Sequence, residues 1–421
     1  MHDSQVPSYA RAVMAALQFA APWRAGLLEL SEADWKKALA FCDRAHLTLL
    51  LGLTCREQLP EWVRARIDRN LAGSAQRWGQ IKAVYEEAAA AFRAQRLEFV
   101  VLKGFSHCPH FASHPGLRHQ YDLDLLFREQ QVFQARDAAV RLGYQPLPDL
   151  NRNPLDHLPA MIRETGWEWR GDYFDPQMPV SLELHYRLWD ERTERFGPRG
   201  LEQFWERRET RVADEVCFAA FHLADAMAYA ALHMLRHLLR GGLRPSHLYE
   251  LAWFLHHHED ESPLWRDWRE LHDDSLRRLQ AICFSLAHRW YGCRMPPAAL
   301  EEIGRLPPDV TRWLEMHSTS PLAGMFHPNK DELWLHWSLL KSRRDRIAVV
   351  WRSVSPLRLP DPMATPRVPG QPFTWRIRLH RRWRWMVHAG SRVTHHVRTV
   401  LPTARSALRW FHPRRDPAST R

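Results

Sequence analysis

The stretch Asp122-Leu-Asp-Leu-Leu-Phe127 decides the fold that we predict for this chain. It is short and mostly apolar, which is typical of a strand within a sheet. Because residues two apart on a strand point to the same side, Asp122 and Asp124 should present their carboxylates side by side. Taken alone, the pattern also fits two acids that face solvent at a strand end, so the surrounding sequence has to distinguish the two interpretations.

The neighbouring segments predict that this strand belongs to a small mixed sheet. Residues 97–102 are apolar and rich in valine, and they run into Lys103 and Gly104 as a buried strand runs into a tight loop. Residues 129–142 have the period of an amphipathic helix, and residues 144–147 predict another strand.

A further strand supplies a third carboxylate. Residues 180–188 alternate between polar and apolar side chains, which places one polar set on a single face: Ser181, Glu183, His185 and Arg187. Hard divalent cations such as Mg²⁺ are bound by carboxylate and phosphate oxygens. Asp122, Asp124 and Glu183 therefore predict a metal platform for phosphoryl or nucleotidyl transfer, in which Glu183 could also deprotonate an attacking hydroxyl.

Helical periodicity surrounds this unit on both sides. Separate helices are predicted over residues 62–71 and 83–92, and Ser31 should cap an earlier helix that carries acids in its first turn. After residue 196 the strongest helical stretches are residues 216–240, 247–257 and 275–290.

The predicted class is therefore α+β, with four parts along the chain. Residues 96–190 form the small mixed-sheet unit, and helical regions at residues 1–95 and 191–350 flank it. Residues 351–421 are rich in Arg, Pro and Trp, and we expect this basic tail to be partly disordered.

The charge of the chain is concentrated in that tail. The 421 residues carry a formal net charge of +11, but residues 351–421 contain 15 Arg against two acids. The first 350 residues are thus close to neutral, which excludes a protein that coats nucleic acid along its whole surface. Residues 375–386 interleave aromatic residues with arginines, so the tail could contact nucleic acid or an anionic membrane surface, or have no specific partner.

Cysteine usage and hydropathy bear on the compartment. The six cysteines form no CxxC pair, which argues against a disulfide scaffold or a structural zinc site and favours reduced thiols in the cytoplasm. No apolar run approaches the roughly 18–20 residues of a membrane-spanning helix. The apolar residues 12–21 are interpreted as an amphipathic helix rather than a signal peptide.

Five ordered segments together resemble a known family. They are Val101-Leu-Lys-Gly104, Pro115-Gly-Leu-Arg118, Asp122-Leu-Asp-Leu-Leu126, Leu142-Gly-Tyr144 and Leu182-Glu-Leu-His185. In this order they look like the poorly characterised bacterial nucleotidyltransferases of the DNA polymerase β-like superfamily. The resemblance is close over residues 98–188 and looser over residues 30–260.

The resemblance implies a role for each matching residue. Asp122 and Asp124 would hold two Mg²⁺ ions, with Glu183 as the third carboxylate. The remaining residues would bind the nucleoside triphosphate: Lys103, Gly104, Ser106, Arg118 and His185. The chain departs from the family pattern in three places, with Phe105 inserted before Ser106, Tyr186 in place of Trp, and Glu250 in place of Asp.

The expected activity is the Mg²⁺-dependent transfer of a nucleoside monophosphate from a nucleoside triphosphate to an acceptor hydroxyl. The acceptor would be a small molecule or peptide-type intermediate, or RNA. The alternative is a non-catalytic nucleotide-binding or partner-binding protein that keeps the fold. Separately, His233 and His237 are four residues apart on a predicted helix, which is compatible with metal binding, with a contact to nucleotide or acceptor, or with packing alone.

Overall fold

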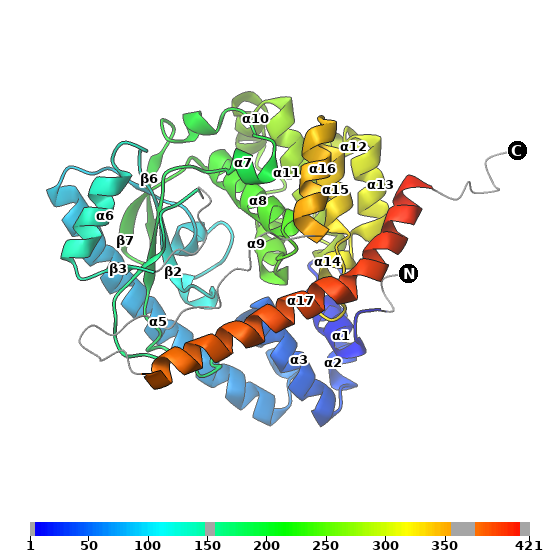
Figure 1. The fold of residues 1–421 in the computed structure, drawn as a ribbon, viewed down its shortest axis with the longest axis horizontal. Coiled ribbons are helices and arrows are strands. Elements are labelled where there is room, and N and C mark those ends of the chain that lie inside the picture. Colours follow the sequence, from blue (N-terminus) through cyan, green and yellow to red (C-terminus); the bar gives the residue numbers. More distant parts are fainter. Residues whose placement is uncertain (1–4, 148–155, 355–374, 413–421) are drawn as a thin grey trace, which may run out of the picture.

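The computed structural model describes residues 5–147, 156–354 and 375–412. A small sheet with helices α5 (Glu61–Ala94) and α6 (Val132–Arg141) lies at one end, and a larger group of helices fills the other (Figure 1). This arrangement confirms the predicted α+β class, with a small mixed sheet between N-terminal and C-terminal helical regions.

The main sheet has five strands in the order β1-β2-β5-β4-β3. Their bounds are β1 (Val100–Val101), β2 (Asp122–Leu126), β3 (Gln145–Pro146), β4 (Met161–Ile162) and β5 (Ser181–His185). Strands β2 and β5 run parallel at the centre, and their register sets Asp124 beside Glu183. The alternation of polar and apolar residues therefore places the acids of both strands on one face, as the sequence predicts.

The apolar face of the sheet packs against α5 and α6. Leu123, Leu125 and Leu184 are fully buried in a cluster with residues of these two helices. The opposite face turns its acids toward α8 (Leu223–Leu239) and α9 (Pro245–His257). The sheet thus separates an apolar core on one side from a polar cavity on the other.

The N-terminal helices lead into one long helix. They are α1 (Ser8–Ala16), α2 (Ala25–Leu28), α3 (Glu32–Ala45) and α4 (Thr48–Thr54), and Ser31 caps α3 by accepting a hydrogen bond from the Asp34 amide at 3.2 Å. Helix α5 is continuous over 34 residues, so the prediction of two separate helices is wrong. Buried Trp78 and Ile81 lie in the part that the prediction left open, and their packing carries the helix across it.

The prediction of one helix over residues 216–240 is also wrong. Strand β7 (Val216–Ala220) pairs with β6 (Glu209–Ala213), and α8 begins only at Leu223. Asp214 and Glu215, with φ values of 47° and 67°, form the tight turn between the two strands. An apolar run of this length does not distinguish a buried strand from the start of a helix, which explains the error.

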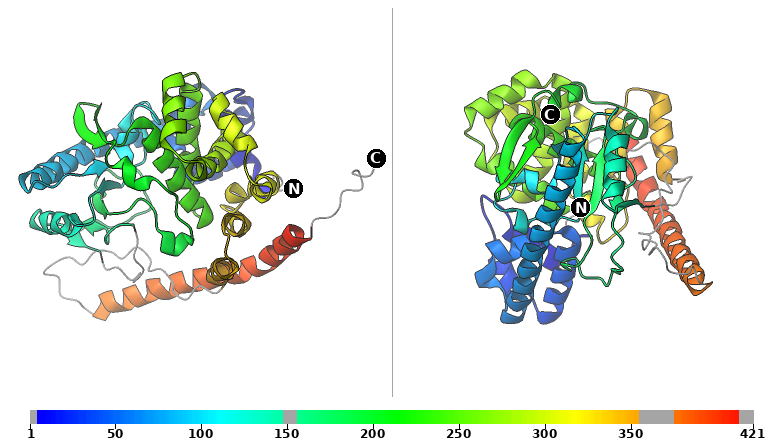
Figure 2. Two further views of the ribbon diagram at one scale, coloured as in Figure 1. Left: turned by 90° about the horizontal axis from the view of Figure 1, so that it is seen from above. Right: turned by 90° about the vertical axis from the view of Figure 1, so that its left-hand side faces the viewer.

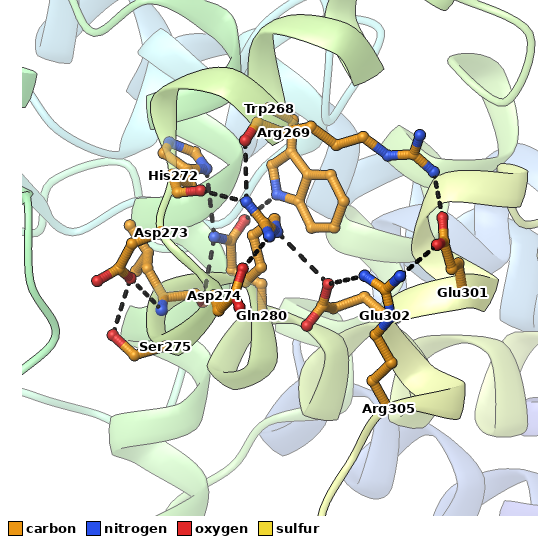
Figure 3. Close-up of polar contacts among 12 residues, drawn as sticks. Trp268, Arg269, His272, Asp273, Asp274, Ser275, Gln280, Glu301, Glu302 and Arg305 are labelled. Atoms are coloured by element: carbon orange, nitrogen blue, oxygen red, sulfur yellow. Dashed lines mark hydrogen bonds and ion pairs between the residues drawn. The ribbon is translucent and has the colours of Figure 1, made fainter.

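Eight further helices complete the C-terminal region that the structure describes. After α9 they are α10 (Ser262–Leu271), α11 (Asp274–Tyr291), α12 (Pro297–Gly304), α13 (Pro308–His317), α14 (Ser320–Ala323), α15 (Glu332–Leu339), α16 (Arg343–Val354) and α17 (Trp375–Phe411). Polar contacts tie α10, α11 and α12 together (Figure 3). The Trp268 indole on α10 donates to Gln280 on α11 at 2.8 Å, and Arg269 on α10 pairs with Glu301 on α12.

Helix α17 lies along one edge of the molecule in both views of Figure 2. Its last turns are attached to the body, because Trp410 is buried and Ser406 donates to Asp331 at 2.6 Å. Further toward the N-terminus of α17, Trp383 and Val387 are exposed. Within the described residues, no helix combines the length and the apolar character needed to cross a membrane.

Candidate functional site

A polar cavity of about 310 Å³ lies between the acidic face of the sheet and helices α8 and α9. Three kinds of ionisable side chain line it. The acids are Asp122, Asp124, Glu183 and Glu250, the cations are Lys103, Arg118, Arg236 and Arg244, and the imidazoles are His46, His119, His157, His233, His237 and His247.

The strand acids meet at one place in this cavity. Asp122 and Asp124 share a face of β2, and Glu183 lies beside Asp124 on β5. Ligand atoms of Asp124, Glu183 and His185 all lie within 4.8 Å of one another. The structure therefore brings together the three carboxylates that the sequence singles out, and their oxygens are the donors that Mg²⁺ prefers.

Asp124 is the most heavily paired of the three acids. Its Oδ1 atom lies 2.7 Å from Lys103 Nζ and 2.9 Å from His185 Nε2. Burial acts to raise the pKa of this carboxyl, but Lys103 and His185 together outweigh burial and hold it below its usual range. Asp124 is thus ionised and held in a fixed orientation.

Asp122 is in the opposite electrostatic situation. Burial raises the pKa of Asp122 to about 7, and the negative charges of Asp124 and Glu183 contribute in the same direction. Two neighbouring strand residues thus differ widely in proton affinity. A divalent cation between them would relieve the repulsion that raises the pKa of Asp122.

His185 lies behind the acids rather than on the cavity wall. It is fully buried, with Nε2 on Asp124 and Nδ1 3.6 Å from Asp156, which also pairs with Arg236 on α8. Burial opposes protonation, but the hydrogen bond to Asp124 and the nearby carboxylate of Asp156 raise the pKa of His185 well above its usual range. The structure thus places His185 where its charge orients Asp124, and away from the surface that a nucleotide would contact.

The loop after β1 positions Lys103 and buries the residues that follow it. Gly104 has φ = +68°, and a Cβ there would lie 2.1 Å from the side-chain amide nitrogen of Gln120, so both the backbone conformation and the packing favour glycine. Phe105 is buried against Phe218, with ring centroids 4.9 Å apart. Ser106 is buried and its hydroxyl donates to the Lys103 carbonyl at 3.1 Å. Of these four loop residues, Lys103 alone lines the cavity.

Arg118 is paired with an acid from the helical region. Its Nε atom donates to Glu250 Oε1 on α9 at 2.8 Å, and His107 Nδ1 lies 3.0 Å from Glu250 Oε2. Burial tends to raise the pKa of Glu250, but Arg118 and His107 lower it overall. The Glu250 side chain thus joins α9 to the loops that precede β2.

Several residues that shape the site carry no sequence pattern of their own. Arg77 on α5 is buried and donates to the carbonyls of Gln120, at 2.8 Å, and of Met178. These carbonyls lie two residues before β2 and three residues before β5, so one guanidinium holds the segments that lead into both acidic strands. Asp156 likewise shows no pattern in the sequence, and its role follows from its contacts with His185 and Arg236 in the fold. His247 lies ten residues after His237, and this spacing is the one feature of the sequence that links the two histidines.

Comparison with known proteins adds a family assignment to this geometry. The model of a family described as uncharacterised nucleotidyltransferases matches residues 31–292, which include both acidic strands and the helices that face them. No curated protein and no solved structure matches the chain. Because the match extends over more than half of the sequence, the chain belongs to this family of uncharacterised nucleotidyltransferases.

Proposed function

We propose that the protein transfers a nucleoside monophosphate from a Mg²⁺-bound nucleoside triphosphate to an acceptor hydroxyl. The observation that supports this most directly is the convergence of Asp122, Asp124 and Glu183 at one side of a polar cavity that also holds cationic side chains. These acids would hold two Mg²⁺ ions. When bound, the ions would offset the charge of the carboxylates and polarise the phosphate oxygens.

One of the acids would also accept the proton of the acceptor hydroxyl. In the proposed reaction the acceptor oxygen attacks the α-phosphorus in line, the bond to the bridging oxygen breaks, and pyrophosphate leaves. Glu183 is partly exposed to the cavity, with 23% of its side chain accessible, and can accept the hydroxyl proton. Asp124 keeps its orientation through Lys103 and His185, which reduces reorganisation during the reaction.

Lys103 and Arg118 would provide the positive charge for the phosphates. Both cations are paired with acids in this structure, Lys103 with Asp124 and Arg118 with Glu250. Phosphate oxygens would therefore share these cations with the acids. Arg244 lines the same cavity, and no ion pair involves it among the described residues, so it is free to contact an anionic group directly.

The test is nucleotide binding and turnover by the full-length chain. Calorimetry with each Mg²⁺-bound nucleoside triphosphate should detect binding, and the Asp122→Asn, Asp124→Asn double variant should lose it. Asp137→Asn, an exposed acid on α6, serves as the matched control and should bind as the wild type does. Unchanged binding in the double variant would contradict the proposal.

The acceptor belongs to one of two classes. It is a small molecule or peptide-type intermediate, or it is RNA. Incubation with a nucleoside triphosphate labelled at the α-phosphate separates them: label in the RNA fraction of a cell extract indicates the second class, and label in a small-molecule or peptide product indicates the first.

A non-catalytic nucleotide-binding role is the second candidate. The buried Phe105 and the inward-facing hydroxyl of Ser106 favour it, because the loop offers no serine hydroxyl to a triphosphate in the cavity. Tight nucleotide binding without pyrophosphate release in the presence of cell extract would support this candidate. Pyrophosphate release that depends on Asp124 would rule it out.

A further inference from the structure

Three histidine side chains converge on the wall of the cavity formed by α8 and α9. His233 and His237 lie one turn apart on α8, and His247 lies in the first turn of α9. One ring nitrogen from each lies within 4.8 Å of one from each of the others. All three residues line the cavity that also contains the strand carboxylates, but they belong to different elements of the fold.

The spacing of these nitrogens resembles that of a metal site. His233 Nε2 and His237 Nε2 are 3.1 Å apart. Two nitrogens bound to one tetrahedral Zn²⁺ at about 2.0–2.1 Å are about 3.3 Å from each other. His247 Nδ1 is buried and has no hydrogen-bond partner among the described residues, so one nitrogen of the third imidazole is available to a ligand.

The backbone holds the three rings in this arrangement. Helix α8 ends in a tight turn, where Gly241 has φ = +68° and the Gly242 amide donates to the His237 carbonyl at 2.8 Å. The chain then starts α9 at Pro245, two residues before His247. The sequence spacing is His-x3-His-x9-His, and a short rigid connection between two helices sets it.

Burial and the surrounding positive charges favour the neutral form of the three imidazoles, which is the form that binds metals. Burial, together with the positive charges of Arg236 and Lys103, lowers the pKa of His237 to about 3. Lys103 and Arg236 are themselves paired with Asp124 and Asp156, which limits their repulsion of a cation.

We propose that His233, His237 and His247 bind a divalent transition metal ion such as Zn²⁺, with its fourth position open to the cavity. Three imidazoles suit Zn²⁺ and related ions, whereas Mg²⁺ prefers the oxygens of the strand acids. The site is thus chemically distinct from the carboxylate site. It does not depend on the proposed nucleotidyl transfer, because each can be present without the other.

The experiment is a titration of the full-length protein with Co²⁺ in the presence of excess Mg²⁺. The excess Mg²⁺ competes with Co²⁺ for the carboxylates, and Co²⁺ reports its ligand geometry through its visible absorption. We expect one equivalent of Co²⁺ to bind with the strong absorption of a four-coordinate ion, and Zn²⁺ to displace it. Weak absorption of the six-coordinate type would overturn the proposal.

Variants on both helices identify the ligands. His237→Asn and His247→Asn should each weaken Co²⁺ binding by at least about 10-fold. His46→Asn is the matched control: His46 lines the same cavity, and its left-handed conformation, with φ = 58°, tolerates Asn. Binding that survives both ligand variants would overturn the proposal and leave the His233–His237 hydrogen bond as a packing contact.

Two further measurements keep the test valid if a variant fails to fold. Circular dichroism establishes that each variant folds, and X-ray absorption at the zinc edge counts imidazole ligands in the unmodified protein. Arg244 is the nearby cation without an acidic partner among the described residues, so Arg244→Gln should bind Co²⁺ at least as tightly as the wild type. An absorption spectrum with only oxygen ligands would contradict the three-histidine site.

Discussion

Asp122 and Asp124 lie two residues apart on one strand, and the pKa values of their carboxyl groups are shifted in opposite directions. Asp124 is stabilised as an anion by Lys103 and His185, whereas burial and its acidic neighbours raise the pKa of Asp122 to about 7. The charge on Asp122 therefore destabilises the metal-free fold. Such an arrangement is typical of residues retained for binding rather than for stability.

The variant Asp122→Asn should accordingly separate stability from binding. We expect it to raise the stability of the metal-free protein by about 1–2 kcal/mol and to abolish binding of Mg²⁺-bound nucleotide. Thermal unfolding without Mg²⁺, paired with calorimetry, measures both effects. Asp124→Asn should lose binding as well, but with lower stability, because it removes the carboxylate that pairs with both Lys103 and His185.

The stabilisation by Asp122→Asn should depend on pH. In the unfolded chain Asp122 ionises near pH 4, and in the fold it ionises near pH 7. Below pH 4 the carboxyl is protonated in both states and brings no penalty. Between pH 4 and about 7 it ionises in the unfolded chain but stays protonated in the fold, so the wild type loses stability until the pH has passed about 7. The difference in melting temperature between variant and wild type should therefore grow from pH 4 to pH 7 and then level off. A constant difference would contradict the shifted pKa.

Gly104 and Gly143 offer a matched pair of substitutions at positive φ. Gly143→Ala should cost about 1 kcal/mol, because its φ is +88° and a Cβ would meet no other atom within 4 Å. Gly104→Ala should cost at least about 2 kcal/mol, since the same backbone strain adds to a clash with Gln120. The Gln120 amide donates to the Asp122 carbonyl at 2.7 Å, so Gly104→Ala should also weaken nucleotide binding. Urea unfolding and calorimetry check both effects, and equal losses in the two variants would contradict this explanation.

Among the elements, α5 positions the acidic strands through Arg77. The guanidinium contacts carbonyls that precede β2 and β5, and lysine cannot reproduce this planar set of donors. We expect Arg77→Lys to destabilise the fold by about 2–3 kcal/mol and to weaken binding of Mg²⁺-bound nucleotide. Urea unfolding and calorimetry measure the two effects. Arg69→Lys changes an exposed arginine of the same helix and should alter neither.

Sequence patterns predicted the elements whose residues alternate strictly and missed those defined by distant contacts. The period of two in β2 and β5 is enough to predict that Asp122, Asp124 and Glu183 share one face, and the register of the two strands agrees. The continuity of α5 depends on side chains that pack against segments far along the chain, and its local composition does not show this. The contact between His185 and Asp156 depends on the fold in the same way. Long-range contacts of this kind leave no periodic trace in the sequence.

At the scale of the whole molecule, α17 should contribute to stability through one end only. Trp410 is buried against the body, whereas Trp383 is 61% exposed. We expect Trp410→Ala to destabilise the protein by about 3–5 kcal/mol, and Trp383→Ala by less than about 0.5 kcal/mol. Neither should change nucleotide binding, because no described residue of α17 lines the cavity. Urea unfolding tests the difference, and equal effects would contradict the attachment of α17 through its last turns.

Helix α5 also determines how the molecule can be divided. At about 50 Å in length it spans both hydrophobic cores: Val63 and Ile67 belong to the core of the helical regions, and Tyr85 and Phe92 to the core beneath the sheet. Truncating the chain anywhere within α5 would remove buried side chains from at least one of the two cores. The five-stranded sheet should therefore not fold when it is separated from the helical regions. We expect the chain to unfold as one cooperative unit, in which destabilising one core also destabilises the other through α5.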